Sequence, residues 1–333
     1  MKKLDALQGL RGLAMIGVFL FHSGFLRQGT FPVTLFFMLS GFLMCYTKSE
    51  KCEKVSFPKW VGGYVFHKLK KFYPLHFITF AMACVVGGVI HKINLEVLFS
   101  ALLNLLLINP FFKKYALIFN GLSWFLSVIL FLYIIAYPLQ KVLNRIENCI
   151  LPFAMTIIII VSLNIANRLG AGLYLYTNPL YRNLDFWLGM LTAKMYLQRR
   201  FAIERANICE IILVVVFLFQ YMISLFIFED PGYYSILFSV ALYVFAVGEG
   251  CVSKLLANNF FQIITYYSFE FYMVHELILR IFRKIFDESI FYPVRLVLIA
   301  VPSMIISALL AFLYRQIGLR RENHTTKERS IQR

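Results

Sequence analysis

Charge inside an apolar segment long enough to cross a membrane is the feature that most constrains this chain. The segment runs from Leu7 to Leu26 and contains Arg11 and His22. Eleven helical residues bring the second side chain to within roughly 20° of the first, about 16 Å along the axis, so both share one face. An ionisable side chain costs free energy in a membrane, which makes the pair a candidate functional site. The alternative interpretation is an arginine that anchors the helix end, with a hydrogen-bonded structural histidine.

The composition predicts an all-α polytopic membrane protein. Of the 333 residues, 60% are hydrophobic and 15% are charged, and the mean hydropathy is +0.73. These values exclude an ordinary soluble domain. The first apolar segment lacks a small-residue cleavage site and carries Arg11, so we expect a retained membrane span rather than a signal peptide.

About ten transmembrane helices are predicted from the apolar segments. They are placed at residues 8–26, 32–47, 72–91, 121–139, 150–167, 182–197, 207–228, 233–250, 261–282 and 292–314. Most lysines and arginines outside these segments fall on one side, and the positive-inside rule makes that side, with both termini, cytoplasmic. The net charge of +16 then reflects topology, so we expect the lipid bilayer rather than nucleic acid as the partner.

The remaining segments complete the predicted architecture. Leu95 to Ile108 is too short to cross comfortably and is bounded by Pro110, which favours one re-entrant or interfacial helix. Residues 1–320 are expected to form one membrane domain, and residues 321–333 a polar, basic, disordered cytoplasmic tail. The six cysteines show no paired spacing, so neither disulfides nor a metal site is expected.

Four local patterns follow one another along the chain. They are Leu4 to His22 with its Arg11, Phe36-Phe37-Met38-Leu39-Ser40-Gly41-Phe42, Lys68-x-x-Lys71-x-x-Pro74-Leu75-His76, and Ser268-x-x-x-Tyr272-x-x-His275. In this order they resemble the acyltransferase 3 family of integral membrane acyltransferases, and the resemblance is to its polysaccharide O-acetyltransferases. It covers almost the whole chain.

The resemblance implies transfer of an acetyl or other short acyl group from cytoplasmic acyl-CoA to a hydroxyl of a cell-surface or exported carbohydrate. Acetyl-CoA enters as a co-substrate, and no permanently bound cofactor is implied. The acceptor is a free or lipid-linked carbohydrate, and the location is the cell membrane, a bacterial inner or plasma membrane. The sequence names neither the glycan nor the oligomeric state.

The resemblance and the residue chemistry together assign roles on the first helix and on the basic motif. Arg11 is expected to bind donor phosphate, and His22 to act as general base on the acceptor hydroxyl, with a covalent acyl-histidine left open. Lys68, Lys70 and Lys71 are expected to add to the donor site. The family prefers arginines here, so lysines supply point charges rather than bidentate bonds. Alternatively they set topology and contact anionic lipid.

A second histidine is expected at the transfer centre. His275 lies at an estimated depth close to that of His22, and we predict the two rings within about 10 Å across a cavity open to both membrane faces. Ser268 and Tyr272 share its helix face by spacing and are substrate-pocket candidates, as is Ser40. The alternatives are an interhelical hydrogen bond for His275 and simple packing for Ser40.

A carboxylate partner is harder to assign from the sequence. Some family members carry acids a few positions after the tryptophan matching Trp124, where this chain has Val128, Ile129 and Leu130. Asp185 and Glu249, both within predicted spans, therefore become candidates to orient a histidine or to contact the acceptor. An ion pair with a neighbouring basic residue is the alternative.

Two other classes of protein compete with the enzyme. In a transporter or flippase of a glycan or small anion, the intramembrane arginine and histidine would line a substrate or proton pathway. Such proteins commonly contain internal repeats, and none is apparent in the sequence. A structural or regulatory membrane protein is the third interpretation.

Overall fold

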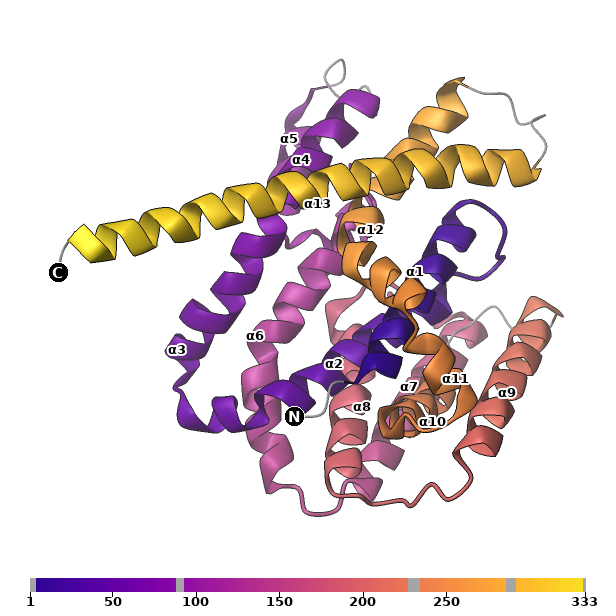
Figure 1. The fold of residues 1–333 in the computed structure, drawn as a ribbon. Helices are drawn as coiled ribbons and strands as arrows, with labels where there is room; N and C mark the ends of the chain where they lie inside the picture. Colours follow the sequence, from indigo (N-terminus) through magenta and orange to yellow (C-terminus); the bar gives the residue numbers. More distant parts are fainter. Residues whose placement is uncertain (1–3, 88–92, 227–233, 286–291, 332–333) are drawn as a thin grey trace.

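The computed structural model describes residues 4–87, 93–226, 234–285 and 292–331. Within these ranges the chain is helical and contains no β-strand (Figure 1). The helices are α1 (Asp5–His22), α2 (Thr30–Lys54), α3 (Phe57–Trp60), α4 (Phe66–Val86), α5 (Leu95–Leu105), α6 (Ser123–Arg145), α7 (Ile150–Ala166), α8 (Pro179–Leu197), α9 (Ala206–Phe226), α10 (Tyr234–Val247), α11 (Cys251–Leu256), α12 (Asn259–Ile285) and α13 (Tyr292–Ile331). Two π-helices, η1 (Val61–Val65) and η5 (Asn167–Ala171), and two 3₁₀ turns, η3 (Asn109–Phe111) and η4 (Lys113–Tyr115), complete the fold.

A helix occupies each segment for which a span is predicted. Six helical stretches in the described part of the chain are long and apolar enough to cross a membrane. They are Thr30–Lys54, Phe57–Val86, Ser123–Arg145, Ile150–Ala171, Ala206–Leu225 and Val294–Leu313. The helices α1, α8, α10 and α12 are shorter or more polar. The count of about ten crossings and the side of each terminus stay predictions.

The third predicted span begins much earlier than its apolar residues indicate. One helical stretch runs from Phe57 through α3, η1 and α4 to Val86, whereas the sequence predicts a start at residue 72. Hydropathy detects the apolar part of a helix, but lysine is a good helix former and continues the backbone hydrogen bonds into a polar region. The predicted end of this span, residues 88–91, lies outside the described residues.

Close packing of α1 against α11 and α12 fixes the centre of the molecule. A methyl group added at Gly9 would lie 1.9 Å from the carbonyl oxygen of Leu256, and one at Gly12 would lie 2.9 Å from that of Phe261. Thr265 donates a hydrogen bond of 2.6 Å to the carbonyl oxygen of Gln8. Small residues on α1 thus let the backbones approach and hold α1 along α12.

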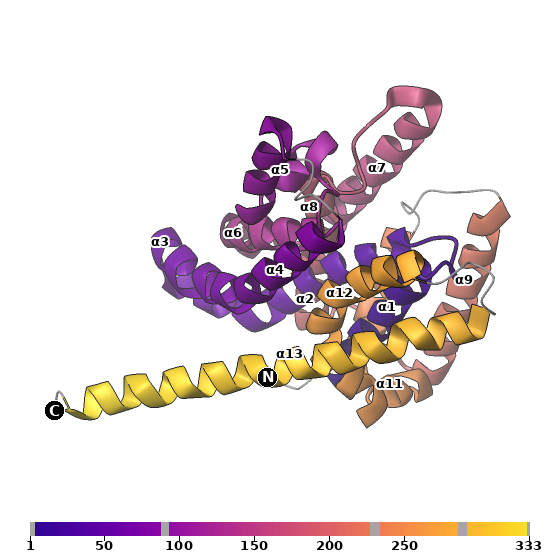
Figure 2. The same cartoon turned by 90° about the horizontal axis from the view of Figure 1, so that it is seen from above.

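Burial separates inner helices from those at the edge. Of the most apolar 18-residue window in each helix, 78% is buried in α2 but 11% in α9. Figures 1 and 2 both show α3 and α9 at opposite sides of the bundle, with α1, α2 and α12 between them. A helix surrounded by protein need not match the lipid, which explains why α1 and α12 tolerate more polar residues.

Two further predictions concern the segment at residues 95–108 and the C-terminal tail. Leu95–Leu105, within the predicted re-entrant segment, is an 11-residue helix that is too short to span the bilayer alone. The helix α13 continues to Ile331, whereas the sequence predicts disorder from residue 321, and its last part projects beyond the other helices in both views. A projecting helix is only marginally stable in water, so disorder of this tail in solution stays a prediction.

Candidate active site

The two predicted histidines meet where α1 ends against α12. The ring centres of His22 and His275 lie 5.4 Å apart at an angle of 61°. This separation is within the predicted 10 Å. It is, however, the distance of an edge-to-face contact, so the expected cavity between the rings is absent in this conformation. The helices α1 and α12 run parallel, with Gln8 beside Thr265 and His22 beside His275, so two residues 253 positions apart lie at the same level of the bundle.

A carboxylate joins His22 from the helix that carries His275. Nδ1 of His22 lies 3.3 Å from Oε2 of Glu276, with the two side chains 24% and 13% exposed. The other oxygen of Glu276 accepts a bond of 3.2 Å from Nε of Arg280, one helical turn later. Because Glu276 is held on both oxygens, the imidazole of His22 has a fixed orientation and keeps Nε2 for a reacting group.

The buried ring of His275 has a defined tautomer when neutral. Its Nδ1 lies 3.0 Å from the carbonyl oxygen of Phe271, and its ring stacks on that of Phe271 at 10°. A carbonyl oxygen only accepts, so Nδ1 carries the hydrogen in this contact. The fully buried Nε2 then holds a lone pair, and it has no hydrogen-bond partner among the described residues.

The segment before α6 is tied to α12 around these histidines. Asn120 donates a bond of 3.0 Å to the carbonyl oxygen of Met273, and the hydroxyl of Tyr272 donates one of 3.2 Å to that of Leu122. The guanidinium of Arg280 donates to the carbonyl oxygen of Phe119, the residue before Asn120. These bonds attach residues 119–122, which form one wall of the site, to α12, the helix that carries His275 and Glu276.

Cations gather around the other end of α1. Arg11 interacts electrostatically with Lys68 of α4 and with Glu270 of α12. Lys71 also interacts electrostatically with both Lys68 and Glu270. Two helices, α1 and α4, therefore bring the predicted donor-binding residues Arg11, Lys68 and Lys71 together, with Glu270 of α12 beside them. Neighbouring like charges repel, so this arrangement is suited to an anionic ligand.

Comparison with known proteins gives a family match over most of the chain. The model of the acyltransferase domain matches residues 4–312. The chain belongs to the acyltransferase 3 family. Membership implies membrane acyltransferase activity in a multi-pass membrane protein. No curated protein and no solved structure matches the chain.

In this acyltransferase the carboxylate beside His22 belongs to Glu276, which was not predicted from the sequence. Glu276 directly follows the motif histidine His275 and lies within the predicted span 261–282, so an acidic residue inside a span was the available signal. After Trp124 this chain has the apolar residues Val128, Ile129 and Leu130, of which Val128 is fully buried. The carboxylate thus comes from α12 and not from α6.

The two carboxylates proposed from the sequence are not found beside the histidines. Asp185 is 1% exposed and pairs with Arg182 at 2.8 Å, while Ser235 donates to its other oxygen at 3.3 Å. The ion-pair alternative therefore holds, since a buried carboxylate needs a cation and hydrogen bonds. Glu249 is exposed and follows the end of α10 at Val247, so its predicted place inside a span is wrong.

Three further predicted site residues have local contacts instead. The hydroxyl of Ser40 donates to the carbonyl oxygen of Phe36 at 2.7 Å, and that of Ser268 donates to Thr265 at 2.8 Å. Such bonds to the preceding turn are typical of serines in membrane helices. The ammonium of Lys70 lies 4.7 Å from the ring centre of Phe66. Tyr272, in contrast, is at the site, with its ring centre 6.0 Å from that of His275.

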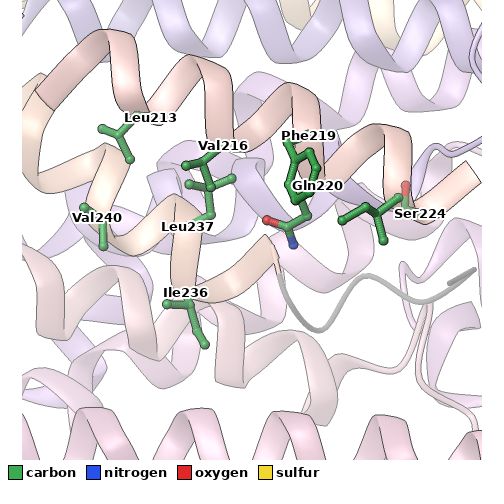
Figure 3. A pocket seen from close by; sticks show the side chains of 9 residues that line it. Leu213, Val216, Phe219, Gln220, Ser224, Ile236, Leu237 and Val240 are labelled. Carbon is green, nitrogen blue, oxygen red and sulfur yellow. The ribbon is translucent and has the colours of Figure 1, made fainter. Parts of the chain in front are cut away.

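An apolar groove lies elsewhere, between α9 and α10 (Figure 3). It has a volume of about 460 Å³ and is lined by Leu213, Val216, Phe219, Gln220, Ile223, Ser224, Ile236, Leu237 and Val240. None of these side chains is a proton donor or acceptor near neutral pH. The groove is therefore not a candidate for acyl-transfer chemistry.

Proposed function

We propose that this protein moves an acetyl or other short acyl group from cytoplasmic acyl-CoA to a hydroxyl of a cell-surface or exported carbohydrate. One observation carries the proposal: a cation cluster and a histidine–carboxylate pair occupy the two ends of α1. Arg11 and His22 are eleven residues apart on that helix, about 16 Å along its axis. This separation is on the order of the pantetheine arm that joins the phosphates of an acyl-CoA to its thioester.

The donor would bind with its phosphates at the Arg11 end. Arg11 presents a planar fork that matches two phosphate oxygens, and Lys68 and Lys71 add point charges. The apolar length of α1 between Arg11 and His22 would lie along the pantetheine arm. The thioester would then reach His22, and holding both reactants there removes much of the entropy cost of the reaction.

His22 would act as the general base. Its Nδ1 contacts Glu276, so Nε2 takes the proton of the acceptor hydroxyl while the oxygen attacks the thioester carbonyl carbon. The new C–O bond replaces the C–S bond, and the CoA sulfur leaves with the proton that His22 returns. Glu276 stabilises the imidazolium that forms in between, and Arg280 keeps Glu276 in place.

A transfer assay tests the proposal. Membranes from a strain that lacks the gene are complemented with wild type, His22→Ala or His67→Ala and supplied with acetyl-labelled CoA from the inner side. His67 is an exposed histidine on α4 and serves as the matched control. We expect loss of about 10²–10⁴-fold in label transferred to surface glycan for His22→Ala alone. Wild-type transfer by His22→Ala, or glycan movement without use of acetyl-CoA, would overturn the enzyme in favour of a structural or transport role.

A further inference from the structure

Lys48 and Tyr64 lie outside the basic motif and extend the cation cluster beyond Lys68. The ammonium of Lys48, on α2, lies 5.8 Å from the ring centre of Tyr64, and that of Lys68 lies 5.6 Å from the same ring. Lys68 is also 5.7 Å from the ring centre of Tyr133. Lys68 interacts electrostatically with both Lys48 and Arg11, and Arg11 also interacts with Tyr133, so Lys68 and the two rings link Lys48 to Arg11.

An irregular helical turn places Tyr64 between these lysines. Tyr64 lies in the π-helix η1, whose wider turn contains Gly62 and Gly63. A π-turn inserts an extra residue and rotates the next residues by about 100° relative to an α-helix, and such turns are frequent at functional sites. A methyl group at either glycine would meet nothing within 4 Å, so close packing does not explain the two glycines.

Stacking makes this part of the cluster rigid. The Tyr64 ring stacks on that of Trp60 with 4.6 Å between centres, and the indole of Trp60 donates a bond of 2.9 Å to the carbonyl oxygen of Tyr133. Lys48 is half-buried against this aromatic group. A lysine held against a ring loses less conformational entropy on binding an anion than a freely moving one.

We infer that Lys48, held by Tyr64, forms a subsite for the 3′-phosphate at the nucleotide end of the donor. The inference rests on the proposed function, because it needs acyl-CoA as the donor. The order of groups in that donor is thioester, pantetheine, pyrophosphate and phosphorylated ribose. The order of residues from the transfer centre is His22, the apolar part of α1, Arg11 with Lys68, and then Lys48.

Charge supports the same assignment. Arg11, Lys48, Lys68 and Lys71 form the cluster, and the carboxylate of Glu270 interacts with Arg11 and Lys71. These four cations and one carboxylate leave an excess of positive charge in the cluster. A donor with a pyrophosphate and a separate monophosphate matches two centres of positive charge better than a single phosphate does.

Binding of CoA and of 3′-dephospho-CoA tests the subsite. Both are titrated calorimetrically into protein in phosphatidylcholine nanodiscs, using wild type, Lys48→Gln and Lys141→Gln. Lys141 is the matched control, because its ammonium also lies over a tyrosine ring, that of Tyr137 at 5.5 Å. Wild type and Lys141→Gln should bind CoA about 10-fold more tightly than dephospho-CoA. Lys48→Gln should lose this preference by weakening CoA binding alone.

The outcomes separate this inference from the proposed function. Equal weakening of both ligands in Lys48→Gln, or an unchanged preference, would overturn the subsite while leaving the donor assignment intact. Absence of CoA binding to wild type would overturn the donor and the subsite together. Nanodiscs that also contain phosphatidylglycerol identify a lipid headgroup as the true ligand if they abolish the Lys48-dependent preference.

Discussion

The two ends of α1 differ in how their charged side chains are arranged. At the Arg11 end cations lie close to one another, whereas at the His22 end the side chains of His22 and Arg280 contact the same carboxylate. Arg11 and Lys68 interact as like charges. His22, Glu276 and Arg280 alternate imidazole, carboxylate and guanidinium within 3.3 Å contacts. The first arrangement gains free energy when an anion arrives, and the second is already organised without one. A binding site and a site of chemistry can thus share one helix.

The largest expected effect comes from breaking the pair at the His22 end. Glu276→Gln removes the charge that orients and stabilises the imidazole, and we expect transfer to fall by about 10²-fold. The loss should appear in kcat, with the Kd for CoA unchanged, and Glu276→Asp should restore part of it. Single-turnover transfer and CoA titration on the same preparations measure both quantities.

The combination with His22→Ala checks whether the two residues act as a unit. If Glu276 works through His22, the double variant should be no slower than His22→Ala alone. Multiplied losses in the double variant, or an equal rise in the Kd for CoA, would assign Glu276 a structural role instead.

Arg11→Lys should weaken the other end without changing the chemistry. The charge remains but the fork that matches phosphate is lost, so we expect the Kd for CoA to rise about 10-fold. Transfer at saturating donor should stay near the wild-type rate. Arg283→Lys is the matched control, because Arg283 is exposed and donates to the carbonyl oxygen of His22 at the opposite end. Equal CoA affinity in Arg11→Lys and wild type would contradict the phosphate assignment.

Ionic strength should affect the two ends differently and by a smaller factor. Raising salt from about 0.01 to 0.15 M shortens the screening length from about 30 to 8 Å, so the Kd for CoA should increase a few-fold. The half-buried pair of His22 and Glu276 should be screened less, and the single-turnover rate of the preformed complex should stay nearly constant. Similar salt dependence of both quantities would show that the ends do not differ as described.

The last prediction concerns the side of the membrane and should leave the rate unchanged. Single cysteines are introduced at Lys113, before α6, and at Lys141, near the C-terminal end of α6, which is long enough to cross the bilayer. With both termini cytoplasmic, a membrane-impermeant maleimide should label position 113 on intact cells and spare position 141. The reverse pattern would place the Arg11 end outside and exclude cytoplasmic acyl-CoA as the donor there.

Helix positions were largely predictable, because apolar segments in a membrane protein have few alternatives to helix. Errors arose where polar residues continue a helix, as at Phe57, and where a carboxylate was assigned by its place in a span. Asp185 has Arg182 three residues away on the same helix, which the sequence already offers as a partner. Glu249 follows Val247 and Gly248, and a glycine in the left-handed conformation, here with φ of 67°, commonly ends a helix, so the sequence did carry a signal against a span through Glu249.

The sequence by itself determined the membrane class, the helices and the shared face of Arg11 and His22, since these depend on local hydropathy and helical periodicity. The tertiary structure decided which carboxylate orients His22, because Glu276 reaches it only through the crossing of α1 and α12. It also decided that Lys48 joins the basic motif across Tyr64. Such pairings depend on how helices far apart in the sequence pack, and hydropathy carries no information about distances between their side chains.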